Sequence, residues 1–208
     1  MSIITKHRDL AQELCRYCRL CYARGLVGAA GGNLSVRLPG TEAYLVTASN
    51  VALRDSEPAM LVVVDSRGDL LEGGSGLRPS KETAFHLSIY RSRAAVNAVV
   101  HVHPTYATVF SVWKMKIPTV TISASLKLKQ GPVVEEAEPG SRELSDRVEA
   151  AVRASGDEVG VLLLERHGLV TFDSTLSGAF NAAELAEDTA RIAYLSDRGG
   201  MMSPDGRL

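Results

Sequence analysis

The chain has 208 residues, of which 45% are hydrophobic and 23% are charged, a composition typical of a globular protein with a sizeable core. We expect a single domain over residues 1–208, with a loosely held tail from about residue 197. The formal net charge of -1 excludes a large basic field for nucleic acid. No apolar run is long enough to span a membrane and no signal-peptide core is visible, so we expect a cytoplasmic protein without a membrane partner.

Three cysteines fall within one segment near the N-terminus. Residues 9–24 have the apolar periodicity of a helix, and Gly25 is suited to end it. Cys15, Cys18 and Cys21 are spaced like a cluster of metal ligands, but the chain has no fourth cysteine. Because small cysteines are common in buried helix faces, we predict that these three side chains pack in the core.

A glycine-rich loop follows, at residues 28–33, and leads into the apolar and polar alternation of a strand at residues 34–38. Such a loop exposes backbone N–H groups that can hold phosphate oxygens, and Asn33 would add a side-chain donor. A plain tight turn explains the same glycines, so the loop by itself leaves both interpretations open.

Two later segments are also suited to contact an anion. Ser49 and Asn50 follow a strand predicted at residues 44–47, where a small polar loop is expected. Ser80 is a plausible N-cap of a helix predicted over residues 80–92. The free N–H groups and the positive dipole end at this helix start would stabilise a phosphate or a carboxylate.

The remaining patterns predict the other elements of the fold. Ser174 is the candidate cap of the last helix, and residues 72–76 are predicted to be a flexible loop tip. Strands are expected at residues 61–64, 96–103, 117–122, 159–164 and 169–172, and helices at residues 104–112, 141–154 and 175–195. Because two hairpins argue against an all-parallel arrangement, we predict an α/β fold with a mixed or mainly antiparallel sheet covered by helices.

Three histidines end apolar strands in this prediction. His101 and His103 are one residue apart, so the alternation of an extended strand points both to the same side. His167 lies in a turn after the buried strand at residues 159–164. Three neutral imidazoles with an open fourth position are typical of a catalytic zinc site. His86 lies on a helix face and is expected to be structural or exposed.

Glu82 is the candidate acid/base. Its helix immediately precedes the histidine strand, so the two elements are expected to pack together. A divalent cation beside it would polarise a carbonyl and stabilise the enediolate that forms when a bond to the adjacent carbon breaks. The simpler alternative is an ordinary acidic residue in the first turn of a helix. No Gly-x-Ser-x-Gly elbow is present and the cysteines lack a catalytic setting, which disfavours nucleophilic hydrolysis.

Four motifs together give the chain a recognisable pattern. They are Gly32-Asn33-Leu34-Ser35-Val36-Arg37, Pro79-Ser80-Lys81-Glu82, His101-Val102-His103 and Arg166-His167-Gly168-Leu169. With these motifs in this order and approximate spacing, the chain resembles the class II aldolase/adducin family, typified by fuculose-phosphate aldolase, over nearly its whole length.

The resemblance implies a three-layer α/β/α fold with a mainly antiparallel central sheet, and a homotetramer with active sites between subunits. It implies Zn²⁺, or Mn²⁺ or another divalent ion in its place, on His101, His103 and His167, with Glu82 as an acid/base that also ligates the metal. The phosphate contacts that it implies come from Gly32, Asn33, Ser49, Asn50, Ser80 and Lys81.

Three departures from the aldolase pattern bear on the reaction. Residues 47–50 read Thr-Ala-Ser-Asn where the aldolases typically have Thr-Pro-Thr-Gly, and Lys81 stands where fuculose-phosphate aldolase commonly has serine. The aldolase tyrosine that donates a proton has no counterpart, since Ile122 and Ser123 occupy that region. The Pro-Ser-Lys-Glu motif instead resembles the branch with the 3-oxo-tetronate 4-phosphate decarboxylases.

We therefore expect a metal-dependent carbon–carbon lyase of aldolase type, acting on a small keto-sugar phosphate through a metal-stabilised enediolate. Decarboxylation of a 3-oxo-tetronate 4-phosphate-like substrate is the nearest alternative, and dehydration of a methylthioribulose phosphate is a third. A non-catalytic interaction domain like the adducin heads is the alternative from another class. Epimerisation is disfavoured because the family's epimerases usually carry aspartate where Glu82 stands.

Overall fold

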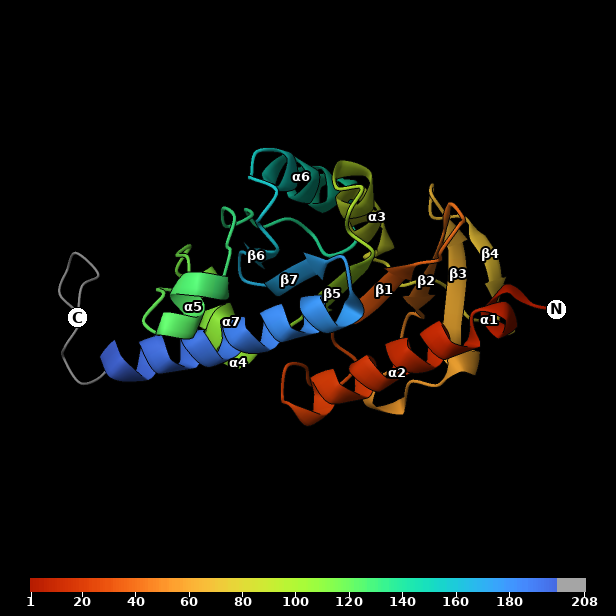
Figure 1. Ribbon diagram of the computed structural model, residues 1–208, viewed down its shortest axis with the longest axis horizontal. Coiled ribbons are helices and arrows are strands. Elements are labelled where there is room, and N and C mark those ends of the chain that lie inside the picture. Colours follow the sequence, from red (N-terminus) through yellow and green to blue (C-terminus); the bar gives the residue numbers. More distant parts are fainter. Residues whose placement is uncertain (198–208) are drawn as a thin grey trace.

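One antiparallel sheet forms the middle layer of the molecule (Figure 1). The structure, a computed structural model, describes residues 1–197. The loose tail was predicted from about residue 197, so all of it after that residue lies outside the described residues. The seven strands are arranged in the order β4-β3-β2-β1-β5-β7-β6, and every neighbouring pair is antiparallel. They are β1 (Asn33–Arg37), β2 (Ala43–Thr47), β3 (Leu61–Asp65), β4 (Leu70–Gly73), β5 (Ala98–Val102), β6 (Val161–Leu164) and β7 (Gly168–Asp173).

Helices cover both faces of this sheet. In Figure 1, α3 (Thr83–Ser92) and α6 (Arg142–Arg153) lie above it, and α2 (Arg8–Ala23) and α7 (Leu176–Asp197) lie below it. The helix α4 (Thr105–Val112) packs with α2 and α7 in one hydrophobic cluster, and α3 and α6 form the second. Each face of the sheet therefore has its own core, which confirms the predicted three-layer fold. Two shorter helices are α1 (Ile3–Lys6) and α5 (Ile122–Lys127).

The predicted burial of the cysteines is confirmed. Cys15, Cys18 and Cys21 lie on the face of α2 that packs into the core, each with 1% or less of its surface exposed. Within residues 1–197, no helix combines the length and the apolar character needed to cross a membrane.

The strand predicted at residues 117–122 is wrong. A helix, α5 (Ile122–Lys127), begins there, and the side chain of Thr121 caps it by accepting a backbone N–H from its first turn. The backbone N–H and carbonyl of Ile117 pair with the side chain of Gln130 instead of with a neighbouring strand. The β-branched residues of this segment fit a side-chain-bonded loop as well as a strand, so their composition alone was misleading.

Residues 72–76 are not wholly a flexible loop tip, because β4 extends through Gly73 at the edge of the sheet. The carboxylate of Glu72 accepts the backbone N–H groups of Ile3 and Ile4, which ties the N-terminal helix to this edge. The first part of this segment, Glu72 and Gly73, is therefore paired with β3 in a hairpin and is not a free loop.

Two predicted caps are displaced by one or two residues. Helix α3 begins three residues after Ser80, whose Oγ accepts the backbone N–H of Glu82 at 3.3 Å. At the start of α7 it is Thr175, not Ser174, whose hydroxyl accepts an N–H from the first turn. In both places the polar residue remains at the helix entrance, and before α3 the chain makes an additional turn at Lys81 and Glu82.

Candidate active site

Three imidazoles meet at one end of the central strands. His101 is at the end of β5, and His103 follows it so that their Nε2 atoms lie 2.9 Å apart, as the two-residue alternation predicts. His167 lies in the turn between β6 and β7, and its ring centroid is 4.8 Å from that of His101 and 5.1 Å from that of His103. The antiparallel pairing of β5 with β7 brings this turn beside the histidine pair.

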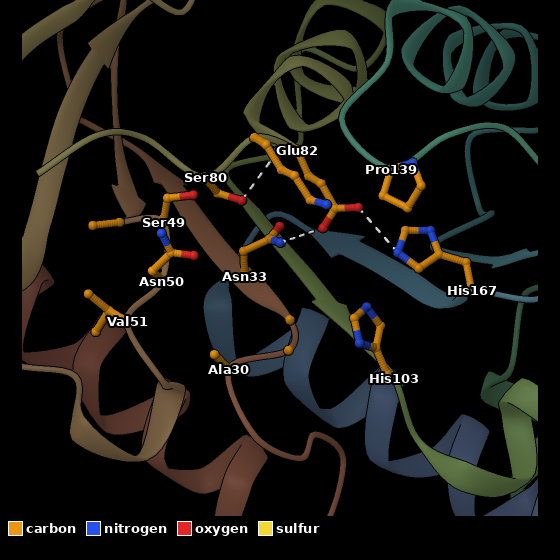
Figure 2. Close-up of a pocket in the computed structure, with 14 residues that line it drawn as sticks. Ala30, Asn33, Ser49, Asn50, Val51, Ser80, Glu82, His103, Pro139 and His167 are labelled. Atoms are coloured by element: carbon orange, nitrogen blue, oxygen red, sulfur yellow. Dashed lines mark hydrogen bonds and ion pairs between the residues drawn. The ribbon is translucent and has the colours of Figure 1, made fainter.

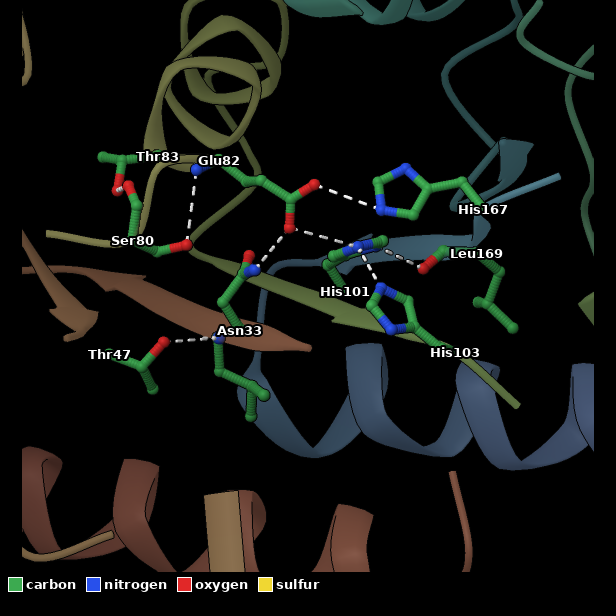
Figure 3. Close-up of polar contacts among 10 residues, drawn as sticks. Asn33, Thr47, Ser80, Glu82, Thr83, His101, His103, His167 and Leu169 are labelled. Carbon is green, nitrogen blue, oxygen red and sulfur yellow. Dashed lines mark hydrogen bonds and ion pairs between the residues drawn. The ribbon is translucent and has the colours of Figure 1, made fainter. Parts of the chain in front are cut away.

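Glu82 completes the cluster from the entrance of α3 (Figure 3). Its Oε1 lies 3.2 Å from His167 Nε2 and its Oε2 lies 3.4 Å from His101 Nε2. Asn33, at the start of β1, donates its side-chain N–H to Glu82 Oε2 at 2.7 Å. One ligand atom from each of the four residues Glu82, His101, His103 and His167 lies within 4.8 Å of the others.

A backbone carbonyl fixes the orientation of His101. Its Nδ1 lies 2.9 Å from the carbonyl oxygen of Leu169, an acceptor, so Nδ1 carries the proton and Nε2 presents its lone pair to the cluster. Burial lowers the pKa of His101 well below its ordinary value, and burial together with the neighbouring His167 lowers that of His103. Both rings are therefore neutral and able to ligate a metal.

The charge of Glu82 differs from that of the rings. Burial by itself would raise its pKa, but His167, His101 and the Asn33 amide outweigh burial and hold the pKa below its ordinary value. The cluster thus offers imidazole nitrogens from three histidines and one ionised carboxylate, a donor set that suits Zn²⁺ and other divalent transition metals. The residues present therefore fit a divalent ion.

A pocket with a volume of ≈ 440 Å³ opens beside the cluster (Figure 2). Glu82, His103 and His167 form one part of its wall. The remainder includes every residue that the sequence suggested for a phosphate: Gly32, Asn33, Ser49, Asn50, Ser80 and Lys81. The predicted anion loops therefore line the same cavity as Glu82, His103 and His167, and His101 is buried behind them.

Two loops are paired on the side of this pocket away from the histidines. A β-bridge joins Ala48 to Pro79, the N–H of Ser49 donates to Arg78, and the N–H of Ser80 donates to Thr47. These two N–H groups are therefore already used within the protein.

The donors left over are those of the neighbouring residues. Within residues 1–197, the backbone N–H groups of Gly32, Asn50 and Lys81 have no acceptor. Lys81 is exposed, and it is the one lysine or arginine among the pocket-lining residues of the described part of the chain. Asn33 has a contact that the sequence did not predict, because its amide nitrogen donates to Glu82, and its buried Oδ1 has no partner among the described residues. Its contact with a phosphate stays a prediction.

Two glycines allow the loop to approach the histidines. A Cβ atom on Gly31 would lie 2.8 Å from His103 Nδ1, and one on Gly32 would lie 2.8 Å from the carbonyl oxygen of His101. Sequence reasoning also missed Val51 and Pro139, which line the pocket. Neither has a local signal, because their place depends on how distant loops pack.

An antiparallel sheet between helical layers, with three imidazoles and a carboxylate converging beside an open pocket, defines the architecture of a metal-dependent enzyme. The family model described as Class II Aldolase and Adducin N-terminal domain matches residues 12–194. The chain therefore belongs to the class II aldolase and adducin family, as its motifs predicted.

Individual relatives agree with this assignment. The chain is 34% identical to an L-fuculose phosphate aldolase of Methanococcus vannielii, over 88% of this chain and 95% of the relative. It is 32% identical to a 3-oxo-tetronate 4-phosphate decarboxylase of Cupriavidus necator, over 96% and 92%. A solved L-fuculose 1-phosphate aldolase superposes with a TM-score of 0.82 at 29% identity, covering 92% of this chain and 88% of the other. These relatives confirm the predicted fold and support an enzyme.

Proposed function

We propose that this chain is a divalent-metal-dependent carbon–carbon lyase of aldolase type that acts on a small keto-sugar phosphate. The convergence of Glu82 with His101, His103 and His167 beside an open pocket is the observation that carries the proposal. The similarity to L-fuculose phosphate aldolases supports the substrate class.

Zn²⁺ is the ion that we propose for this site, with Mn²⁺ or another divalent ion as a functional replacement. The three imidazoles would hold it, and the Glu82 carboxylate would be a further ligand. When bound, such an ion supplies positive charge that polarises a substrate carbonyl and stabilises the negative charge developing as the adjacent carbon–carbon bond breaks.

Glu82 is proposed to move the proton. Its carboxylate is ionised, and the residue is buried, with 4% of its surface exposed. Asn33 occupies Oε2, so Oε1 is the oxygen without an amide donor and faces the space beside His167. In this arrangement Oε1 takes the substrate's hydroxyl proton during cleavage and returns it in the reverse reaction.

The opposite side of the pocket is proposed to hold the phosphate. Free backbone N–H groups at Gly32, Asn50 and Lys81 supply directed donors, and the Lys81 ammonium supplies charge. The hydroxyls of Ser49 and Ser80 line the same region. Because Ser49 and Asn50 lie across the pocket from His103 and His167 (Figure 2), a phosphate bound beside them would hold the substrate with its carbonyl end toward the metal ligands.

Decarboxylation of a 3-oxo-tetronate 4-phosphate-like acid is the second candidate, and Lys81 is the observation that favours it. Among the described residues, no tyrosine lines the pocket to act as the proton donor of an aldolase, whereas a lysine beside the anion loops suits a substrate with two negative groups. The decarboxylase relative supports the same choice.

One experiment tests both candidates. The purified protein is analysed for bound metal, stripped with a chelator, and reloaded with Zn²⁺ or Mn²⁺. Each form is then assayed for triose phosphate released from L-fuculose 1-phosphate and for carbon dioxide released from 3-oxo-tetronate 4-phosphate. Release of triose phosphate from L-fuculose 1-phosphate supports the aldolase. Release of carbon dioxide from 3-oxo-tetronate 4-phosphate, without cleavage of L-fuculose 1-phosphate, supports the decarboxylase. A protein that binds no divalent ion and gains no activity from one would contradict both, and would favour a non-catalytic domain.

We also propose a homotetramer with active sites at subunit interfaces. Apolar side chains are exposed around the end of α4 and along α5, with Ile122 81% exposed and Leu126 65% exposed. Trp113 and Met115 are half-exposed beside them in sequence. Apolar surface of this kind is typical of contacts between subunits. Light scattering after size exclusion tests the proposal, since a monomer would contradict it.

The cytoplasmic location stays a prediction.

A further inference from the structure

Polar side chains connect β1 to α3 at regular intervals, where an apolar interface would be usual. Alternate residues of β1 face the helix, and each contacts a residue one helical turn further along α3. The pairs are Asn33 with Glu82, Ser35 with His86, and Arg37 with Tyr90. We call these six residues the polar ladder.

The spacings of the two elements explain why three successive pairs can form. Two residues of a strand span about 6.6–6.8 Å, and four residues of a helix span about 6.0 Å. The mismatch is below ~1 Å per pair, which flexible side chains can absorb over three pairs. A shift of α3 by one residue would move each of its side chains by ~1.5 Å along the helix axis and rotate it far around that axis. Such a shift would break all three pairs.

The contacts within the ladder are short. Asn33 Nδ2 donates to Glu82 Oε2 at 2.7 Å, as Figure 3 shows. The Ser35 hydroxyl lies 2.7 Å from His86 Nδ1 and 2.8 Å from the Tyr90 hydroxyl. Arg37 ends the series: it donates to the Tyr90 carbonyl at 3.1 Å, and its guanidinium lies 5.2 Å from the Tyr90 ring centroid.

Stability alone does not account for the middle pair. Ser35 and His86 have no exposed surface, and His86 Nε2 is buried without any hydrogen-bond partner. An unsatisfied buried polar atom costs about 1–3 kcal/mol, so an apolar pair of similar size would stabilise the interface at least as well. What hydrogen bonds add over apolar contacts is direction, since they hold one register and exclude its neighbours.

We infer that the polar ladder is a positioning device that sets the axial position of α3 on the sheet and thereby places the Glu82 carboxylate against the histidine cluster. Ser35 and His86 are positioning residues in this inference, and they act on Glu82 through the helix. The inference deepens the proposed function, because it rests on Glu82 being the acid/base of the lyase.

The first test needs neither metal nor substrate. His86→Leu removes the middle contact, and Ser88→Ala is the matched control, because Ser88 is an equally buried hydroxyl on α3 that bonds Phe85 and faces Ser145 of α6. The readout is the pair of Asn33 side-chain N–H signals in a two-dimensional ¹H–¹⁵N NMR spectrum. We expect these signals to shift in His86→Leu and to stay in place in Ser88→Ala, with thermal stability of His86→Leu equal to or above that of the wild type.

The second test measures the consequence for the site. Metal titration and steady-state kinetics of the loaded enzyme should show weaker metal binding and a kcat about 10–100-fold lower in His86→Leu, with KM within about twofold, because displacement by about 1 Å can cost 100-fold. In a Glu82→Gln background the same substitution should have no further effect on metal binding. Ser35→Ala gives an independent variant if His86→Leu fails to fold.

The outcomes separate the ladder from the proposed function. Asn33 signals that stay in place in His86→Leu and Ser35→Ala, or metal binding and kcat equal to those of the wild type, would overturn the positioning inference. A further loss of metal affinity in the Glu82→Gln background would also overturn it, because the effect would not pass through Glu82. A wild type without any metal affinity contradicts the proposed function instead, and the Asn33 signals still decide whether the ladder positions α3.

Discussion

Replacing Gly32 by alanine tests the packing between the glycine-rich loop and the histidine strand. Gly32 has φ +76°, in the left-handed region, where an alanine costs about 1–2 kcal/mol. The new Cβ would also lie 2.7 Å from Val27 Cγ1 and 2.8 Å from the carbonyl oxygen of His101. The Val27 side chain can move aside, but the carbonyl belongs to β5, so β1 and β5 must separate locally at a cost of about 1–3 kcal/mol.

Gly32→Ala is therefore expected to lose about 2–5 kcal/mol of unfolding free energy. For a chain of this size that corresponds to a melting temperature lower by roughly 4–20 °C. Because the displaced carbonyl belongs to a proposed metal ligand, the variant should also bind a divalent ion more weakly than the wild type.

Scanning calorimetry of the metal-free proteins at one concentration measures the difference. Gly28→Ala is the matched control, since Gly28 lies in the same loop, has a φ outside the left-handed region and has no atom within 4 Å of its added Cβ. We expect the control to melt within about 2 °C of the wild type. Equal melting temperatures for the two variants would refute the reasoning that Gly32 is required by both conformation and space.

Three other predictions concern charge and reactivity. Glu82→Gln keeps the shape of the side chain but removes its base, so kcat should fall about 10²–10⁴-fold in steady-state assays, whereas Glu42→Gln at an exposed position should leave it unchanged. Burial lowers the pKa of His86 to about 3 from 6.5. Above pH 6.5 the ring is neutral in both the folded and the unfolded state, and from pH 6.5 down to about 3 only the unfolded chain takes up a proton on it. The unfolding free energy should therefore fall by up to about 1.4 kcal/mol per pH unit in this range. In pH-dependent denaturation, His86→Leu should lose this slope. Burial raises the pKa of Cys15 to about 11 and that of Cys18 to about 12. Iodoacetamide at pH 8 should therefore label both thiols slowly in the native protein and rapidly in urea. Fast labelling of the native protein would contradict their packing in the core.

Features that depend on short sequence distances were predicted well. The alternation of an extended strand placed His101 and His103 on one side, and the periodicity of α2 placed its cysteines in the core. Local composition failed at residues 117–122, where the bonds of Ile117 to the side chain of Gln130 replace a strand ladder.

The role of Asn33 shows the limit of a motif. Its place in the glycine-rich loop suggested a phosphate donor, but it did not indicate the contact of its amide nitrogen with Glu82, 49 positions later in the chain. The relevant spacing exists in the sequence, since polar residues recur every second position in β1 and every fourth position from Glu82. It becomes informative only once the sheet and α3 are known to pack face to face.

The sequence by itself determined most of the helices and strands, the types of side chain that could bind a metal, and the position of the histidine pair. Strand alternation, helix periodicity and turn chemistry act over a few residues, so they can be read from the sequence. Tertiary structure alone decided that His167 reaches His101 through the pairing of β7 with β5, that Glu82 is held by β1, and that two loops close the pocket opposite. Those arrangements depend on strand order and on which faces of the helices are buried, which are properties of the whole chain and are not encoded in any local pattern.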